Sequence, residues 1–424
     1  MAEETYLVRY EAMKIRPVLI IVPLLILAFA LAGGSILMMR LFFFSLFILL
    51  LSYLWAVFSL HGIKVQVRKS SERSQVGEWF DEEITVFNKS RLPKSMITVQ
   101  ENSDLPGHHN ILSFNLSPRS SHLWQAKAYC RRRGQYSLGT FGVTVTDPFG
   151  FFTLRRSFGE PQSILVYPAT LELPLFQPES RNMLGYGPNR WLRSDISPNA
   201  ARVREYVDGD TLNHIHWHST AHTGKLMVKV FDPERITYAS RNIWLVLNMH
   251  QAAQLGSGDD TTEEYGVTIA ASLMKKYIDS GKQVGLIASG DQPNYFPAET
   301  GDKHLLHVLE ALALMKATGE VPIDQLLSQE TEHFEASSTI IIITPSTDDQ
   351  IAETVRYLEN RVNMVIVILL DSISFGGTVS AAGTAKRLIS TGAQVYLVRR
   401  GQDLSRALDS RVPSSSMSYA GDVV

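Results

Sequence analysis

The stretch that decides how this chain is organised is Arg202–Glu234, RVREYVDGDTLNHIHWHSTAHTGKLMVKVFDPE. The residues before it have the pattern of short strands, and those after it alternate between strands and helices. The stretch therefore joins two kinds of domain. It is also the densest run of chemically reactive side chains in the sequence, so a site is expected here first.

Three histidines of this stretch lie two residues apart. In an extended segment alternate side chains share a face, so His214, His216 and His218 would lie together. Ile215 and Trp217 would lie on the other face. Three imidazoles can bind zinc, but zinc needs ligands that converge, and a flat strand spreads them. The favoured interpretation is a solvated histidine face opposite a packed Ile215 and Trp217 face.

Upstream of the histidines, Asp208, Gly209 and Asp210 have the composition of a turn. Glycine adopts positive φ, and aspartate hydrogen-bonds the local backbone. The two carboxylates are also potential cation ligands, so that alternative stays open. The turn is favoured because these are ordinary turn residues.

The spacing of polar and aromatic residues in this stretch resembles the signature of a prokaryotic family, domain of unknown function 58 (DUF58), which includes YeaD-like membrane proteins. The resemblance is carried by Arg204, Tyr206, Gly209, Asp210, Ile215, Trp217, Ala221, Gly224, Leu226, Val228 and Lys229. It implies a binding role for the first six of these. We expect Ile215 and Trp217 to pack the junction between the halves, and Arg204, Tyr206 and Asp210 to fix its geometry by hydrogen bonds.

Length and composition limit the class of protein. The 424 residues predict two soluble domains with additional segments. A net charge of −2 gives no basic field for nucleic acid. A single cysteine, Cys130, excludes an intramolecular disulfide framework and fits a reducing compartment.

The N-terminal region predicts a membrane anchor. Residues 1–16 form a polar tail, and residues 17–60 contain two apolar runs separated near Arg40. Each run is close to the length of a membrane span. A cleaved signal peptide is disfavoured because acids precede the first run and a second run follows. A buried soluble hairpin is disfavoured because both helices are apolar all round.

Basic residues predict the orientation of this anchor. They gather before the first span and after the second, whereas the turn holds Arg40 alone. Because positive charge favours the cytoplasmic side, both ends and the soluble domains should be cytoplasmic, with a multi-pass anchor in the inner (plasma) membrane. An envelope-facing sensor is the disfavoured alternative.

Residues 61–170 predict an immunoglobulin-like β-sandwich, because short strands recur between turn residues. Within it, Arg131–Tyr136 and Asp147–Gly150 resemble further signatures of the same family. The arginine triplet, residues 131–133, is either a site for anionic lipid or an acidic partner, or a solvated strand end, which we favour. Asp147–Gly150 is expected to be a structural turn.

The C-terminal half predicts an α/β domain. Residues 171–239 comprise a linker and the signature stretch, residues 240–408 alternate apolar strands with helices, and residues 409–424 are expected to be disordered. Apolar strands alternating with helices indicate a doubly wound parallel sheet. Five strands are expected, at residues 243–247, 284–288, 339–344, 364–370 and 394–398.

In the family this α/β region resembles a von Willebrand factor A-like domain. Such domains can carry an Asp-x-Ser-x-Ser metal site after the first strand. Asn248–Ala252 occupies that position here and lacks the acidic and hydroxyl ligands that hard cations prefer. We therefore expect a degenerate domain without a metal or cofactor.

Two functions remain as hypotheses. The first is a non-enzymatic, membrane-anchored assembly factor; the resemblance implies a MoxR-type AAA+ ATPase as partner, and the sequence has no P-loop of its own. The second is a metal-dependent hydrolase that uses His214, His216 and His218, with His222 and the Asp208 and Asp210 carboxylates nearby. Common hydrolase motifs are missing from the sequence, so the first is favoured.

Overall fold

The computed structural model describes residues 10–15, 18–69, 73–174, 176, 202–207, 215–230, 242–290 and 293–409. The chain divides into two compact units. The first comprises Met1–Thr170 together with Leu305–Lys316, and the second comprises Leu171–His304 with Ala317–Val424. The sequence did not predict that residues 305–316, which form most of a helix, would belong to the first unit.

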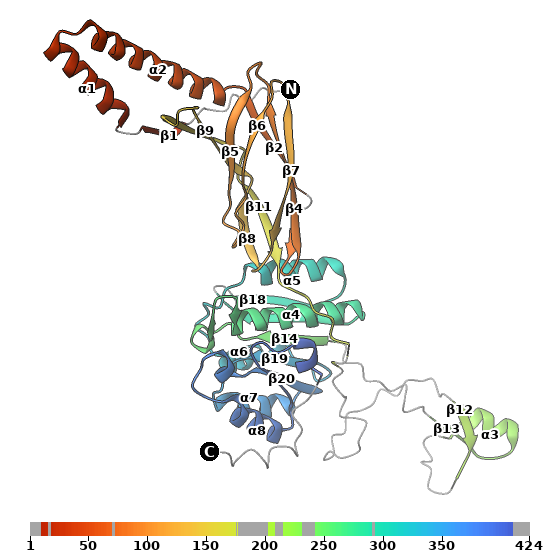
Figure 1. The fold of residues 1–424 in the computed structure, drawn as a ribbon. Coiled ribbons are helices and arrows are strands. Elements are labelled where there is room, and N and C mark those ends of the chain that lie inside the picture. The colour runs from red at the N-terminus through yellow and green to blue at the C-terminus, as the bar shows by residue number, and fades with distance from the viewer. Residues whose placement is uncertain are drawn as a thin grey trace. The chain divides into compact units, whose positions relative to one another are not determined.

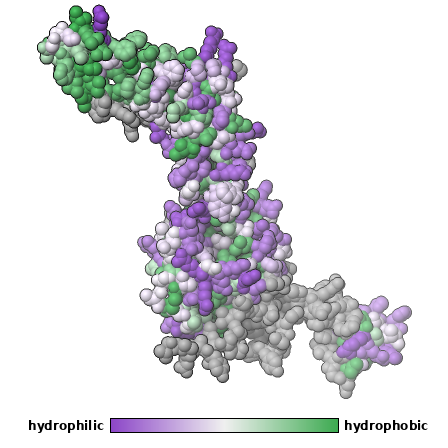
Figure 2. Space-filling view, in the orientation of Figure 1, coloured by the Kyte–Doolittle hydropathy of each residue, from purple (hydrophilic) through white to green (hydrophobic). Residues whose placement is uncertain are grey.

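Two apolar helices follow the N-terminal residues of the first unit, α1 (Val18–Gly33) and α2 (Ile36–Leu60) (Figure 1). Helix α2 is long and apolar enough to cross a membrane, whereas α1 is a shorter apolar helix. Figure 2 shows hydrophobic residues covering both helices. Large side chains such as Phe43, Phe44 and Phe47 are exposed on α2. This exposure suits a helix surrounded by lipid rather than water.

The last turns of α2 pack against the β-rich part of the same unit. Their buried residues recur at helical spacing: Ser52, Ala56, Ser59 and Leu60. Ala56 and Leu60 belong to the same apolar cluster as Ile84 and Val143 of the β-strands. The buried ammonium of Lys94 donates to the carbonyl of Phe58 near the end of α2. The end of α2 is thus continuous with the core of the β-rich domain.

The described residues of 61–170, joined by one strand from residues 10–15, form three sheets in which every neighbouring pair of strands but one is antiparallel, and this confirms the prediction of a sheet-rich domain. One sheet has the order β2 (Ile63–Lys69), β4 (Trp79–Asn88), β7 (Ser121–Tyr129). A second has the order β1 (Tyr10–Ile15), β10 (Phe152–Phe158), β9 (Thr140–Thr146), β5 (Lys94–Asn102), β6 (Ile111–Leu116). A third has the order β3 (Arg73–Gln75), β11 (Gln162–Tyr167), β8 (Gly134–Leu138), with β3 parallel to β11.

Two apolar clusters fill this domain because alternate residues of its strands point inward. The cluster nearer α2 joins Ile84 and Val86 of β4 to Ile97 and Val99 of β5, across the two larger sheets. The other cluster joins β4 and β7 to β8 and β11: Phe80, Leu105, Ala128, Cys130, Leu138, Ile164 and Val166. Each residue in this second list is buried.

Neither interpretation of the arginine triplet fits Arg133, which is buried. Its Nε donates to the carbonyl of Leu312 and its Nη2 to that of Met315, both at 2.9 Å. These carbonyls lie at the end of α5 (Asp302–Leu314), where helix carbonyls lack partners within the helix. The hydroxyl of Tyr136 donates to the carbonyls of Arg132 and Arg133 at 3.2 Å. Part of the predicted signature therefore holds a helix end.

We expect Arg133→Ala to destabilise the protein by about 3 kcal/mol, because it leaves two helix carbonyls without a charge-assisted donor. The free energy of unfolding in urea measures this loss. Arg131→Ala is the matched control, since Arg131 is exposed and belongs to the same triplet. Equal effects of the two substitutions would contradict the assigned role.

The second unit contains a six-stranded sheet with the order β18 (Pro293–Glu299), β17 (Gln283–Ser289), β14 (Asn242–Leu247), β19 (Thr339–Thr344), β20 (Met364–Leu370), β21 (Gln394–Val398). Strands β17, β14, β19, β20 and β21 are each parallel to the next strand in this order, which confirms the predicted parallel sheet. Edge strand β18 runs antiparallel to β17 and was not predicted.

Helices cover both faces of this sheet, as expected for strands that are apolar on both sides. Helices α6 (Ile323–Gln329), α7 (Gln350–Glu359) and α8 (Ala381–Thr391) share one apolar cluster with the sheet. Helix α4 (Thr262–Asp279) packs on the other face of the sheet, where Gly266 lies close to the side chains of Leu247 and Ile343. Short α9 (Leu404–Ala407) follows β21.

Candidate functional site

The strand order defines where a ligand is expected to bind in the second unit. The chain passes from β14 to β17 on one side and reaches β19 on the other side. Ligands of doubly wound sheets bind at this switch point, beyond the carboxyl ends of the strands. We call this region the carboxyl edge; it comprises residues 248–255, 345–349, 371–380 and 399–403, which follow β14, β19, β20 and β21.

At the centre of the carboxyl edge, Asn248 links β14 to β19. Its Nδ2 donates to Thr344 Oγ1 at 2.8 Å, and its Oδ1 accepts from the backbone N–H of His250 at 3.0 Å. Asn248 and Thr344 are both buried. An amide suits this position because one end must donate and the other accept, and a carboxylate only accepts when ionised.

The adjoining hydroxyl groups also hold loops. Thr344 Oγ1 accepts from the N–H of Ser346 at 3.0 Å, and Ser346 Oγ donates to Asp348 Oδ2 at 2.8 Å. Ser372 Oγ donates to the carbonyl of Pro345 at 3.2 Å. These bonds connect the segments after β19 and β20. The arrangement builds a rigid edge out of groups that could otherwise contact a ligand.

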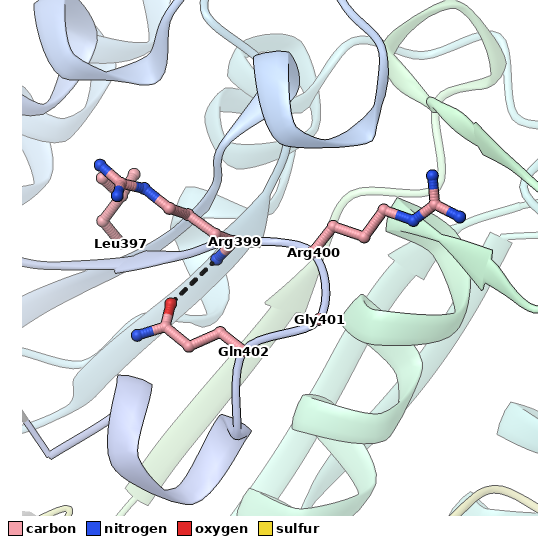
Figure 3. A pocket seen from close by; sticks show the side chains of 5 residues that line it. All are labelled: Leu397, Arg399, Arg400, Gly401 and Gln402. Atoms are coloured by element: carbon pink, nitrogen blue, oxygen red, sulfur yellow. Dashed lines mark hydrogen bonds between the residues drawn. The ribbon is translucent and has the colours of Figure 1, made fainter.

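The segment after β21 lines a hollow of about 350 Å³, together with Leu397. In Figure 3 the side chains of Arg399 and Arg400 extend in different directions from this segment, and Gln402 Oε1 accepts from the N–H of Arg399 at 3.3 Å. Arg399 Nε lies 3.5 Å from Asp371 Oδ2, and Arg400 Nη2 lies 3.1 Å from Asp260 Oδ2. Both guanidinium groups are partly exposed and held in place by carboxylates.

Aliphatic side chains accompany these arginines. Ile373 is 52% exposed and Val379 is 55% exposed, both on the loop after β20. That loop adjoins the arginines, because the N–H of Arg400 donates to Ser374 Oγ at 3.0 Å. We call Ile373, Val379, Arg399, Arg400 and Gln402 the edge patch. Arginine is enriched in protein interfaces, and the exposed aliphatic side chains add apolar area beside it.

The signature stretch is described in part, as a small hairpin. Strand β12 (Arg202–Glu205) pairs antiparallel with β13 (Met227–Val230). Ile215 is buried and forms a bridge with Val228 inside the hairpin, so its expected place at the junction between the halves stays a prediction. The N–H of Tyr206 donates to the carbonyl of Leu226 at 2.8 Å. Arg204 is exposed, and its Nη1 donates to the adjacent carbonyl of Glu205.

The strand predicted through the histidines is wrong from Trp217 onward, where helix α3 (Trp217–Thr223) begins. His216 is its N-cap, with Nδ1 accepting from the N–H of Ser219, and Gly224 ends it at φ 70°. His216 and His218 are therefore a cap and a helical residue rather than two positions of one strand, and their ring centroids lie 6.2 Å apart. The capping side chain of His216 and the helix-ending Gly224 are the sequence signals of this helix. They were overlooked because the alternation of histidines with apolar residues resembles a strand.

Trp217 is 68% exposed, so the prediction that it packs the junction is wrong in this structure. It is the first residue of α3, a helix that is described throughout and in which no residue is buried. The remaining predicted site residues, Asp208, Gly209, Asp210 and His214, lie outside the described residues. Because His214 is among them, the three-histidine site stays a prediction; the ring centroids of the two described histidines, His216 and His218, lie 6.2 Å apart.

Comparison with known proteins supports the family resemblance. Residues 202–374 match the model of a protein family of unknown function, DUF58. The uncharacterized protein YeaD of Bacillus subtilis (strain 168) is 27% identical over 198 residues, which cover 47% of this chain and 47% of the relative. The chain thus matches about half the length of that relative. The resemblance stated from the sequence is confirmed over residues that include the signature and most of the parallel sheet.

Solved structures resemble parts of the chain only distantly. The CARDB domain of a Pyrococcus furiosus protein aligns with a TM-score of 0.19 and 14% identity, covering 24% of this chain and 91% of that structure. Proximal thread matrix protein 1 from the mussel byssus aligns with a TM-score of 0.28 and 15% identity, covering 39% of this chain and 46% of that structure. Scores this low carry no argument about function.

Proposed function

We propose that this protein is a non-enzymatic, membrane-anchored interaction or assembly factor that binds a protein partner through its carboxyl edge. The observation that carries the proposal is the edge patch, where exposed Ile373 and Val379 accompany two exposed arginines. Arginine is one of the residue types enriched among the few that carry most of the binding energy in protein interfaces. The fixed loops around them reduce the entropy cost of binding.

The hydrogen bonds at the carboxyl edge support binding over catalysis. Asn248, Thr344 and Ser346 bond one another or the adjacent loops. A nucleophile or metal ligand must instead be available to the substrate or the ion. The groups at the switch point therefore serve to shape a surface.

The finer architecture belongs to the same proposal. We assign the second unit as a degenerate von Willebrand factor A-like domain: numbered along the chain, its strand order is 3-2-1-4-5-6 with an antiparallel third strand. The sheet-rich domain is immunoglobulin-like, and α1 and α2 both cross the membrane. The basic residues that flank the two helices favour both soluble domains in the cytoplasm.

The proposed partner is a MoxR-type AAA+ ATPase. The choice follows from the family resemblance stated from the sequence, which implies such a partner. The sequence has no P-loop. The chain would then be an adaptor or client, and the ATPase would supply the work of assembly.

The test is capture of the partner by chemical crosslinking in native membranes, followed by mass spectrometry and metal analysis of the eluate. We expect the wild-type protein to recover an AAA+ ATPase. The double variant Arg399→Gln/Arg400→Gln should recover at least about 10-fold less of that ATPase, which is the effect of losing one hot-spot contact. Arg361→Gln is the matched control, since Arg361 is an exposed arginine outside the carboxyl edge. Equal recovery by all three proteins would contradict the proposal.

A further inference from the structure

A polar cluster interrupts the apolar interior of the β-rich domain. On β4, Phe80, Glu82, Ile84 and Val86 alternate with outward-facing residues, and all four are buried. Phe80 belongs to one apolar cluster, whereas Ile84 and Val86 belong to the other. Glu82 therefore lies at a core position between two apolar clusters, where a carboxylate is costly unless it is compensated.

The facing strand places a second carboxylate at the same level. On β5, Ile97, Val99 and Glu101 occupy alternate buried positions. Strands β4 and β5 belong to different sheets, so Glu82 and Glu101 extend inward from opposite sides. The other inward positions named on both strands are apolar, so two acids facing each other here point to a specific binding or structural role.

His108 completes the cluster from the loop between β5 and β6. Its Nε2 lies 2.8 Å from Glu101 Oε2, and Glu101 Oε1 accepts from the N–H of Gly139 at 3.1 Å. One ligand atom from each of Glu82, Glu101 and His108 lies within 4.8 Å of the others. The exposed fractions of the three residues are 2%, 6% and 8%.

The three side chains offer ligand types that transition metals accept. Glu82 and Glu101 supply carboxylate oxygens, and His108 supplies an imidazole nitrogen. All three residues are buried, and their ligand atoms lie close together although they come from two strands and a loop. This convergence of ligand atoms favours a metal ion at the centre of the cluster.

We propose that Glu82, Glu101 and His108 bind one divalent transition-metal ion, for which zinc is the best match. Zinc accepts imidazole nitrogen and carboxylate oxygen at about 2.0–2.2 Å, so its ligand atoms lie about 3.3 Å apart. Shifts of about 1.5 Å would bring the three atoms to that spacing. Magnesium and calcium prefer sites built from oxygen atoms, so the imidazole disfavours them.

The expected effect of the ion is to join the two sheets. Glu82 comes from β4 and Glu101 from β5, while His108 comes from the loop after β5. Binding to the folded state alone stabilises that state by mass action. The proposed ion is therefore structural: it would fasten the domain that carries the membrane anchor. This site is separate from the carboxyl edge and does not depend on the proposed partner.

The test uses the full chain in detergent, purified without a histidine tag and stripped with a chelator. We expect it to bind about one zinc ion per chain and to gain thermal stability with added zinc chloride, whereas magnesium chloride has little effect. Glu82→Gln should weaken zinc binding by at least about 10–100-fold. Removing a residue that only hydrogen-bonds a metal ligand already has an effect of that size, and Glu82 would be a ligand itself. Glu83→Gln is the matched control, because Glu83 is the next residue of β4 and faces outward.

Two further variants make the result decisive. Glu101→Gln should lose zinc like Glu82→Gln, with far-ultraviolet circular dichroism confirming that both remain folded. The triple variant His214→Gln/His216→Gln/His218→Gln should keep its zinc. Zinc that survives Glu82→Gln but is lost in the triple variant would overturn the proposal and favour the histidine stretch. Absence of stoichiometric zinc binding in wild type would also overturn it.

Discussion

Replacing Gly319 by alanine should destabilise the second unit by about 5 kcal/mol, at the upper end of single substitutions. A Cβ on Gly319 would lie 1.9 Å from the carbonyl oxygen of Ser289 and 3.1 Å from that of Met249. Both are backbone atoms at the carboxyl ends of β17 and β14, so no side-chain rotation relieves the clash. Urea unfolding of the full chain, followed by tryptophan fluorescence, measures the change.

The same close approach explains how the carboxyl edge is closed. The N–H of Gly319 donates to the carbonyl of Met249 at 3.1 Å, and its own carbonyl accepts from the N–H of Gln251 at 2.9 Å. Gly383→Ala is the control: Gly383 lies inside α8 with open space around its missing Cβ, so alanine should stabilise by about 0.5–1 kcal/mol. A milder effect at Gly319 than about 1 kcal/mol would refute the packing argument.

The second large effect is expected for Asp147→Ala, at about 4 kcal/mol, because three donors would lose a buried carboxylate. Asp147 is 3% exposed. Its side chain accepts from the N–H of Phe149 at 3.0 Å, from that of Phe152 at 2.6 Å, and from the hydroxyl of Ser52 on α2. Asp147 therefore fixes its own turn and also fastens the membrane helix to the β-rich domain.

Chemical denaturation of the full chain in detergent measures this effect. Asp81→Ala is the control, since Asp81 is an exposed aspartate of β4 whose ion pair with Lys127 is 3.8 Å long and solvated. Ser52→Ala should cost less than Asp147→Ala, about 1 kcal/mol, because the turn keeps its backbone bonds. If Asp147→Ala and Asp81→Ala unfold at the same denaturant concentration, the anchoring role is wrong.

Patterns that repeat over several residues predicted the fold well. The apolar runs of β14, β19 and β20 identified a parallel sheet, because strands buried on both faces need no polar side. Strand β18, PNYFPAE, was missed because its prolines argue against a strand. It is an edge strand, the position where proline is tolerated.

Individual residues were harder to place. Trp217 and His216 alternate with their neighbours in a way that fits a strand, yet a cap and a glycine produce a helix there. Arg133 was expected in solvent, because nothing in the local sequence shows that residues 312 and 315 supply carbonyls to it. Contacts between residues so far apart depend on tertiary packing, which periodicity does not report.

Glu82 shows where a sequence signal was present but overlooked. It follows Phe80 and precedes Ile84 at strand spacing, so the alternation places a carboxylate on the inward face. Its partner His108 lies in a loop without periodicity, and only the fold brings the two together. The same limit applies to the edge patch, whose residues come from loops after two different strands.

Partner binding at the carboxyl edge is tested most directly by site-specific photo-crosslinking. A photo-reactive amino acid at Gln402 lies within the edge patch, and one at exposed Tyr357, near the end of α7, serves as the control. In native membranes we predict that the Gln402 probe crosslinks to an AAA+ ATPase and the Tyr357 probe does not. Crosslinking of the ATPase from Tyr357 but not from Gln402, or from neither, would contradict the account.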